Sequence, residues 1–369
     1  MFHGAIAMDI EERLAIIMRN AEELVTVDEL RTLLIEKEEP TAYIGFEPSG
    51  IVHLGWVLVA QKIKDLTDAG FKVTVFWADW HAYINDKLGG DLENIRTCAR
   101  YMEDCFIALG IPADKVEFKY ASEVLSNIEY WETVIKVAKV TTLARVKKSM
   151  TIMGRSQDEA EVDSSKLFYP ILQATDIFCM GQDVAYAGLD QRRAHMLARD
   201  AAEKLGWKKP IALHTPLIPG LKGGNRMNAG AKDPDAFDYK MSKSSPDGSI
   251  FIHDTREDIA RKMKKAYCPP EQEFETENPV LMFCKYILFP RNGTLDIDRP
   301  EKYGGPVSFS SYEELTSSYF GGGLSPVDLK SGVIDGLART LAPVEEYFRN
   351  KPENYEAMLG VLKGIGKLR

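Results

Sequence analysis

The sequence predicts an α/β protein in which a doubly wound parallel sheet is followed by a smaller helical part. Residues 41–46 and 73–77 are short apolar runs, typical of strands buried on both faces of a parallel sheet. Residues 55–69 between them carry apolar side chains at helical spacing. A strand, a helix and a strand in this order predict a βαβ unit, the building block of doubly wound sheets. From Thr255 onward the pattern is helical to the last residue, which indicates the second part.

Each further element follows from its local pattern. Residues 9–39 are rich in Glu and Leu at helical spacing and predict one or two N-terminal helices. The helix over 55–69 has Val59, Ile63 and Leu66 on one face, and Gly70 ends it. The same patterns predict the following further elements: helices over 91–110, 127–150, 166–180 and 191–205, short strands over 116–120 and 211–214, and a polar loop over 154–165.

A change in composition divides the chain. Residues 222–248 are dominated by Gly, Asn, Asp, Pro and Lys, and a loop of this length in a compact protein is usually functional or disordered. We therefore expect four segments in this order: an N-terminal helical arm over 1–40, an α/β domain over 41–222 with a helical insertion at about 90–165, the loop over 223–250, and a C-terminal helical domain over 251–369.

Composition excludes several classes of protein. The 369 residues have a net charge of −9, which does not by itself suggest nucleic-acid binding, although Arg145, Lys147 and Lys148 form a locally basic segment, as do residues 261–265. Five cysteines without a C-x-x-C pair argue against a disulfide framework and a zinc ribbon, and favour a reducing cytosol. No apolar run is long enough for a membrane span, and the N-terminus lacks the pattern of a signal peptide.

The junction between the first strand and its helix predicts an anion site. It reads Phe46-Glu47-Pro48-Ser49-Gly50-Ile51-Val52-His53-Leu54-Gly55-Trp56. Ligands of open α/β sheets bind beyond the carboxyl ends of the strands, where the free N–H groups of the following helix attract anions. Gly50 and Gly55 would let a ligand approach the backbone closely. Many α/β proteins have such a junction, so this signal is weak when taken alone.

A second motif lies in the long loop and makes the first one specific. Lys240-Met241-Ser242-Lys243-Ser244 carries two lysines that could neutralise charge on a departing pyrophosphate. Together, in this order, the two motifs resemble the HIGH and KMSKS signatures of class I aminoacyl-tRNA synthetases. The preceding Gly45-Phe46-Glu47-Pro48-Ser49-Gly50 is similar to the archaeal and eukaryotic tyrosyl branch of that family.

The resemblance extends from about Tyr43 to Arg349. Its further strings begin at Ala78, Tyr169 and Gly188, and two more, from Arg299 and Ser311, look like the C-terminal anticodon-binding domain of archaeal tyrosyl enzymes. The resemblance implies a Rossmann-like catalytic domain that joins tyrosine to tRNA with ATP, and a homodimer paired through the insertion at about 90–165. It also implies Mg²⁺ arriving with ATP, no structural metal, no membrane and a cytoplasmic location.

One part of the amino-acid pocket can also be derived physically. Tyr169, Gln173 and Asp176 follow one another at i, i+4 and i+7, so they share one face of a helix. A phenol needs a buried acceptor for its hydroxyl, and an ionised Asp176 suits that task, with Tyr43 beside it. The family's roles at the matching positions then predict the tyrosine-binding residues Tyr43, Gly45, Glu47, His81, Tyr169, Gln173, Asp176 and Gln191.

The remaining site residues follow from the resemblance. The predicted catalytic residues are His53, Lys240 and Lys243. The predicted ATP-binding residues are Pro48, Ser49, Gly50, His53, Gly55, Gly188, Asp190, Met241, Ser242, Lys243 and Ser244. Arg145, Lys147 and Lys148 are predicted to lie near the acceptor end of tRNA, with the two lysines preferred.

Two alternatives remain open at this stage. A tryptophanyl enzyme shares the fold and both motifs, although Tyr43 and Asp176 fit a phenol better than an indole. A non-catalytic relative that binds tRNA is suggested by Trp56, which stands where the HIGH motif ends in His and cannot neutralise phosphate charge. The intact Lys-Met-Ser-Lys-Ser string argues against it. His195 and His214 fit core or surface roles better than metal ligation.

Overall fold

The computed structural model describes residues 8–153, 163–223, 241 and 246–367, and its centre is a six-stranded sheet. The strand order is β1-β6-β5-β2-β3-β4. β2 to β6 run parallel, and β1 pairs antiparallel with β6 at one edge. The strand bounds are β1 Glu23–Val25, β2 Thr41–Phe46, β3 Lys72–Trp77, β4 Val116–Tyr120, β5 Val184–Gly188 and β6 Ile211–Thr215. The predicted doubly wound parallel sheet is confirmed.

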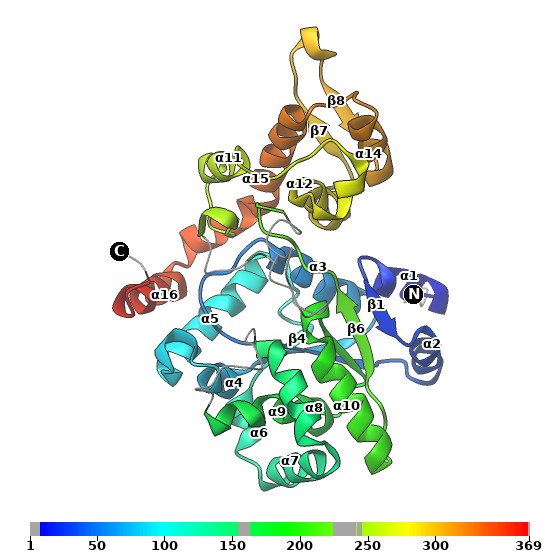
Figure 1. Ribbon diagram of the computed structural model, residues 1–369, viewed down its shortest axis with the longest axis vertical. Helices are drawn as coiled ribbons and strands as arrows, with labels where there is room; N and C mark the ends of the chain where they lie inside the picture. Colours follow the sequence, from blue (N-terminus) through cyan, green and yellow to red (C-terminus); the bar gives the residue numbers. More distant parts are fainter. Residues whose placement is uncertain (1–7, 154–162, 224–240, 242–245, 368–369) are drawn as a thin grey trace, which may run out of the picture.

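Helices surround this sheet in the lower part of Figure 1. Their bounds are α1 Ile10–Met18, α2 Val27–Glu36, α3 Gly55–Asp68, α4 Asp79–Ile84, α5 Leu92–Ala108, α6 Ala121–Leu125, α7 Ile128–Val140, α8 Leu143–Ser149, α9 Phe168–Cys179 and α10 Arg192–Leu205. The chain leaves β2 toward β3 on one side, whereas β5 lies on the other side of β2. Ligands of such sheets bind at this point of reversal, beyond the carboxyl ends of the strands.

Two strands of this six-stranded sheet were not predicted from the sequence. β1 is three residues long and exists through its pairing with β6, in which Leu24 lies opposite Leu213. β5 reads Val-Ala-Tyr-Ala-Gly, and its small residues give a weak strand signal although the strand is buried between β2 and β6. Both strands depend on partners that are distant in the sequence, so their local pattern does not reveal them.

A buried lysine fastens the N-terminal segment to α3. Lys62 is 1% exposed, and its ammonium group donates to the Ile17 carbonyl at 2.7 Å and to the Arg19 carbonyl. Asp65, one turn further along α3, pairs with the Arg19 guanidinium. Burial lowers the pKa of Lys62 to about 8, against the raising effect of Asp65. The end of α1 is therefore held against α3 by charge-assisted hydrogen bonds.

The C-terminal part is mostly helical but also contains a small antiparallel sheet (Figure 1). Its helices are α11 Arg256–Met263, α12 Pro279–Phe283, α13 Phe289–Asn292, α14 Tyr312–Phe320, α15 Pro326–Asn350 and α16 Glu353–Gly364. The expectation of a helical pattern from Thr255 to the end is wrong for β7 Leu295–Ile297 and β8 Val307–Phe309. Gly304 and Gly305 have φ values of 97° and 71° between these strands, a left-handed backbone that ends helical structure.

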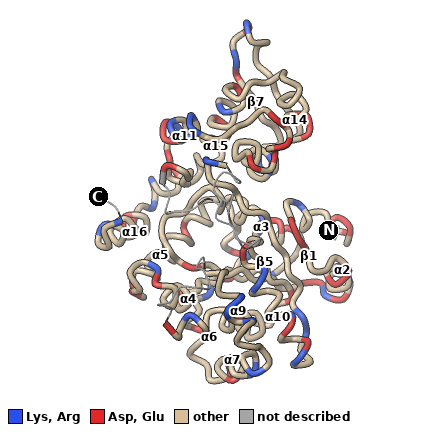
Figure 2. Tube along the Cα trace, viewed as in Figure 1, with Lys and Arg blue, Asp and Glu red and all other residues tan. Residues whose placement is uncertain are grey.

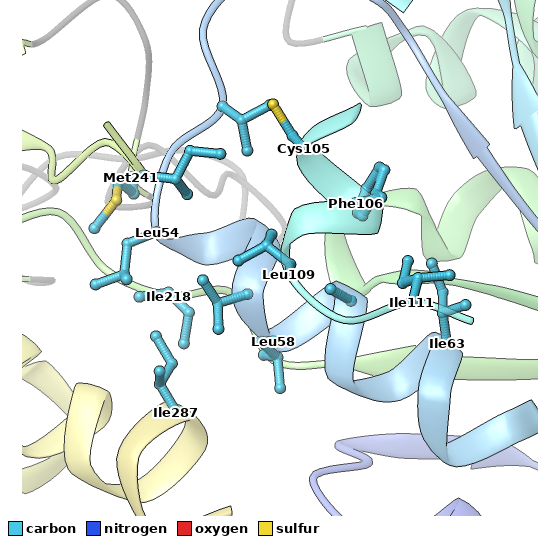
Figure 3. Close-up of a cluster of buried hydrophobic side chains, with 14 of the residues drawn as sticks. Leu54, Leu58, Ile63, Cys105, Phe106, Leu109, Ile111, Ile218, Met241 and Ile287 are labelled. Atoms are coloured by element: carbon cyan, nitrogen blue, oxygen red, sulfur yellow. The ribbon is translucent and has the colours of Figure 1, made fainter. Parts of the chain in front are cut away.

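One hydrophobic core joins the sheet to the C-terminal part. Figure 3 shows Leu54 and Leu58 at the start of α3 in the same cluster as Phe106 of α5. Ile287, which follows α12, belongs to this core as well, and so does Met241, which is 3% exposed. Met241, which belongs to the predicted loop motif, is therefore anchored in the core beside the start of α3 (Figure 3).

Candidate active site

A cavity of about 1310 Å³ lies beyond the carboxyl ends of the strands. It is lined by the end of β2, the start of α3, one face of α9 and the segments that follow β5 and β6. Residues 248, 249, 251, 253 and 254 and one side of α16 complete the wall. The cavity therefore has one end at α9 and another between α3 and α16.

Asp176 forms the floor of the α9 end and is 1% exposed. Its Oδ1 accepts a hydrogen bond of 2.6 Å from the Tyr130 hydroxyl, which comes from α7. Its Oδ2 lies 3.1 Å from His81 Nε2, but neither atom completes a hydrogen bond within the described chain. Burial opposes protonation of His81, yet Asp176, Glu47 and Asp79 together outweigh it and raise the pKa of the imidazole. Oδ1 of Asp176 is thus held by Tyr130, whereas Oδ2 faces His81 and, with two lone pairs, can accept from a further donor.

Two glutamines and a tyrosine form the wall above this floor. Gln173 Nε2 donates to Gln191 Oε1 at 3.2 Å, and Gln191 Nε2 donates to the Ile152 carbonyl. Gln173 Oε1 is buried and has no hydrogen-bond partner among the described residues. Burial and the neighbouring Glu47 raise the pKa of Tyr169, so its phenol stays neutral. Buried polar atoms are normally satisfied, so the open acceptors on Gln173 and Asp176 indicate a polar ligand.

Close packing leaves no room for a side chain at Gly45. A Cβ atom there would lie 2.5 Å from the hydroxyl oxygen of Tyr43. Tyr43 is 2% exposed, and burial together with Asp176 raises its pKa. Tyr43 and Asp176 both line the cavity. A neutral phenol and a carboxylate therefore lie at the same end of the cavity and can share one hydroxyl group of a ligand.

His53 lies at the other end, where α3 begins. Its Nδ1 accepts a hydrogen bond of 3.2 Å from the amide of Gly55, and a Cβ atom at Gly55 would lie 3.0 Å from the ring. The segment around His53 pairs with residues 250–252: Leu54 donates to the Ile250 carbonyl at 2.8 Å, and Ile252 donates to the Val52 carbonyl at 3.1 Å. The end of the long loop is therefore paired, backbone to backbone, with the segment that carries His53.

Trp56 is a packing residue of the same junction. Its ring centroid lies 4.8 Å from that of Phe46 and 5.9 Å from those of His53 and Phe106. Trp56 also lines the cavity. The aromatic side chain at the last position of the motif therefore joins α3 to α5 and to the end of β2, and it supplies surface rather than charge.

Comparison with known proteins assigns the chain to a family. Residues 36–239 and 234–342 match the model of the class I tRNA synthetases of the W and Y type. The chain belongs to this family. It is 51% identical over 342 residues to a tyrosine–tRNA ligase of Aeropyrum pernix, with 92% of this chain and 93% of that protein covered. It is 46% identical over 365 residues to the corresponding ligase of Saccharolobus solfataricus, with 98% and 99% covered.

Solved structures of the family agree with the fold. The crystal structure of tyrosyl-tRNA synthetase from Aeropyrum pernix matches with a TM-score of 0.84 at 44% identity, covering 96% of this chain and 99% of that one. The synthetase of Pyrococcus horikoshii, complexed with L-tyrosine, matches with a TM-score of 0.88 at 42% identity, covering 95% and 99%. The fold class and the class I synthetase family expected from the sequence are both confirmed.

Most of the site residues expected for this synthetase line one cavity. All eight residues predicted for tyrosine lie there, together with Ser49, Gly50, His53, Gly55, Gly188, Asp190 and Met241 of the nucleotide set. Of the described residues predicted for ATP, Pro48 alone is not part of the lining. Lys240, Ser242, Lys243 and Ser244 lie outside the described residues. Their roles stay predictions.

The three residues predicted to contact tRNA lie on α8, away from the cavity lining. Arg145 pairs with Asp200 at 2.7 Å, whereas the side chains of Lys147 and Lys148 are exposed. The contact of these three residues with tRNA stays a prediction. Figure 2 shows Lys and Arg of the described residues distributed over both parts of the chain.

Sequence reasoning missed several residues of the synthetase site. Tyr130, on α7, lies 46 residues before Asp176 in the sequence and donates a hydrogen bond to it. Nothing in the local sequence around Tyr130 indicates this contact. Asn85 donates to Glu47 at 2.8 Å. It is the last residue of the family string that begins at Ala78, but the sequence suggested no role for it. Tyr355 and Leu362 of α16 belong to the lining although no family string was recognised beyond residue 350.

The described part of the synthetase contains no group of three or more His, Cys, Asp or Glu side chains placed to hold a metal ion. His195 and His214 are 1% and 0% exposed and contact each other through Nδ1 and Nε2 at 3.0 Å, so they are core residues. The described helices are too short or too polar to cross a lipid bilayer.

Proposed function

We propose that this synthetase is a tyrosine–tRNA ligase. The observation that carries the proposal is the floor of the cavity, where the buried Asp176 and Tyr43 lie beside the open acceptor of Gln173. In this proposal, Asp176 Oδ2 accepts a hydrogen bond from the phenol hydroxyl of tyrosine, and Gln173 Oε1 accepts one from its α-ammonium group. The tyrosine in the Pyrococcus horikoshii structure, which shares this fold, supports the assignment.

This floor also explains the choice of amino acid. Phenylalanine has no hydroxyl for Asp176 Oδ2 and Tyr43, and a site built around a substrate hydroxyl rejects such an analogue strongly. Tryptophan carries a single N–H donor on a larger ring and has no hydroxyl oxygen that could both donate to Asp176 and accept from Tyr43. Tryptophan is therefore the weaker alternative substrate.

The reaction proceeds in two steps. The tyrosine carboxylate attacks the α-phosphate of ATP, which forms tyrosyl-adenylate and releases pyrophosphate. A ribose hydroxyl of the terminal tRNA adenosine then attacks the acyl carbon, and AMP leaves. ATP enters as its Mg²⁺ complex, in which the ion neutralises phosphate charge. Catalysis comes from positioning the substrates and from stabilising charge on the phosphates.

The residues of the α3 end perform the charge stabilisation. His53 and the start of α3 line this end of the cavity, so we assign the phosphates of ATP to it, and Gly50 and Gly55 let them approach the backbone. Lys240 and Lys243 supply positive charge from the loop, whose end is anchored by Met241 and by the pairing of residues 250–252 with 52–54. The motif with Trp56 is therefore competent, because the aromatic ring fixes the junction that presents His53.

The exposed apolar face of α7 supports a homodimer. α7 exposes Ile128, Trp131 and Ile135 on one face, and such an apolar stripe is typical of a protein contact. We assign it to a homodimer, since it lies within the predicted insertion. In this proposal, Lys147 and Lys148 bind the acceptor end of tRNA, and the part of the chain from residue 251 binds the anticodon. We assign the protein to the cytoplasm, where its tRNA substrate is used.

ATP–pyrophosphate exchange tests the proposal directly. Tyrosine, tryptophan and phenylalanine are offered separately to the purified protein. We expect exchange with tyrosine alone. Exchange with tryptophan would mean that Asp176 does not select a phenol, and absence of exchange with all three, on folded protein, would place the chain among non-catalytic relatives that bind tRNA.

A further inference from the structure

The junction between α15 and α16 is locked onto α5 by one buried carboxylate. Asp104 is 3% exposed and accepts hydrogen bonds from three side chains of this junction: Tyr347 at 2.7 Å, Lys351 at 2.7 Å and Asn354 at 2.6 Å. α16 then runs along α5 with Met358 fully buried (Figure 1). Because a buried carboxylate with three charge-assisted or polar donors is costly to expose, the position of α16 is well fixed.

A stack of rings leads from α16 toward the site. The ring of Tyr355 lies 3.9 Å from that of His253, with an angle of 14° between the planes, and Tyr101 of α5 stacks on both at 5.7 Å. Phe348 packs on His253 edge-on at 4.9 Å. Burial lowers the pKa of His253 to about 4, so the stacked imidazole is neutral near pH 7.

Hydrogen bonds continue from the stack to the His53 segment. The backbone N–H of Val52 donates to the Tyr101 hydroxyl at 3.3 Å, and this hydroxyl lies 2.8 Å from His253 Nε2. An amide can only donate, so the Tyr101 hydroxyl accepts from Val52, and the same oxygen is hydrogen-bonded to the neutral ring of His253. His253 also follows residues 250–252, which pair with residues 52–54.

α16 also belongs to the wall of the cavity. Tyr355, Leu359 and Leu362 line it on the side of His253, the end at which α3 begins. The same ring of Tyr355 therefore faces the cavity and supports His253. No other described helix of the C-terminal part contributes residues to the lining.

We propose that α16 is a working part of the active site, in which Tyr355 acts as a positioning residue. Through His253 and Tyr101 it holds the Val52–Leu54 segment, and hence His53 and the start of α3, in the geometry needed at the phosphates. The inference rests on the proposed tyrosine–tRNA ligase activity for its kinetic consequence, but its structural consequence is independent of that activity. Displacement of a positioned group by about 1 Å can cost about 100-fold in rate.

The test compares three variants of the full chain. Tyr355→Ala removes the stacked ring, Tyr355→Phe keeps it, and Met358→Ala weakens the packing of the same helix without touching the cavity. For Tyr355→Ala we expect kcat/KM for ATP in the exchange reaction to fall at least about tenfold, with the tyrosine dissociation constant, measured by titration calorimetry, unchanged. Tyr355→Phe should restore the wild-type value, and Met358→Ala should leave it within about twofold.

Hydrogen exchange of the backbone amides gives a second readout that needs no activity. In Tyr355→Ala, the peptides that contain Val52, Leu54 and Ile252 should exchange about tenfold faster, whereas Met358→Ala should accelerate only peptides of α16. Equal effects of Tyr355→Ala and Met358→Ala, or unchanged exchange around Val52, would overturn the positioning role. If the wild-type protein shows no tyrosine-dependent exchange of pyrophosphate, the proposed function fails, and the amide measurement still decides the role of Tyr355.

Discussion

The hydroxyl of Tyr130 donates a hydrogen bond of 2.6 Å to Oδ1 of Asp176, which joins α7 to α9 beneath the cavity. Both residues are buried, and the bond occupies Oδ1, so Oδ2, which also faces His81, is the oxygen that can accept a hydrogen bond from the substrate. The phenol of Tyr130 thus fixes which oxygen of Asp176 is presented to the ligand.

Loss of this bond should weaken the binding of tyrosine. A hydrogen bond to a charged group is worth about 1.5–3 kcal/mol, so Tyr130→Phe is expected to raise the tyrosine dissociation constant about tenfold or more, because Asp176 can then rotate. Titration calorimetry measures this dissociation constant. Tyr319→Phe is the matched control, since its buried hydroxyl bonds the Cys268 and Pro269 carbonyls, and none of these three residues lines the cavity. An equal change in both variants would show that Tyr130 acts only on stability.

A side chain at residue 45 should close the pocket. The Cβ atom of Gly45→Ala would lie 2.5 Å from the Tyr43 hydroxyl, so the phenol must move and the tyrosine affinity should fall at least about tenfold. Gly360→Ala, on α16, meets nothing within 4 Å and should leave affinity unchanged while adding up to about 1 kcal/mol of stability. Wild-type affinity in Gly45→Ala would show that Tyr43 lies away from the ligand.

The buried histidine pair should make the protein sensitive to acid. Burial, and His214 beside it, hold the pKa of His195 well below its ordinary 6.5. Above pH 6.5, His195 is neutral in both the folded and the unfolded state. Below pH 6.5, His195 binds a proton in the unfolded state but stays neutral in the folded state. The free energy of unfolding should therefore fall as the pH falls, by up to about 1.4 kcal/mol per pH unit for this residue. Urea unfolding between pH 7.5 and 5 gives this free energy, which should depend less steeply on pH in His195→Gln than in the wild type. The same pH dependence in both proteins would show that His195 is not the residue responsible.

Dimerisation should depend on the exposed face of α7. Ile135 is 68% exposed, and Ile135→Glu is expected to convert a dimer into a monomer, because a charge would be buried in an apolar contact. Light scattering after gel filtration gives the mass. Val327→Glu is the control, since Val327 is 75% exposed on α15 and should keep the dimer. A wild-type monomer at micromolar concentration would remove the proposed interface.

Charge in the long loop should act on the first chemical step. Lys243→Ala is expected to slow adenylate formation about 100-fold, with little change in tyrosine affinity, because the cation is needed only as pyrophosphate departs. Single-turnover formation of tyrosyl-adenylate measures the step. Lys265→Ala removes an exposed lysine that lies just after α11 and should leave the rate unchanged. Equal rates in wild type and Lys243→Ala would exclude the loop from the mechanism.

The parts of the fold that sequence could predict are those with a strong local pattern. β2 and α3 begin at the predicted residues, because continuous apolar runs and helical spacing are properties of neighbouring residues. The hairpin β7–β8 and strand β5 were missed, since short strands of small or mixed residues exist only through their partners.

The same distinction holds for the site. Tyr169, Gln173 and Asp176 could be placed together because they share one helical face, and the two motifs could be paired by resemblance. The contacts of Tyr130 with Asp176, of Phe251 with His53 and of Tyr355 with His253 join residues separated by dozens to hundreds of positions. No local pattern encodes such contacts, so only the folded chain reveals them.

The short strand β1 also has a consequence for the behaviour of the protein at high concentration. Without it, β6 would present a row of unpaired amides and carbonyls, the kind of edge on which other chains assemble into aggregates. β1 covers Ala212 to His214 of that row, and at three residues it offers little edge of its own. The N-terminal segment thus shields the sheet from unwanted intermolecular pairing.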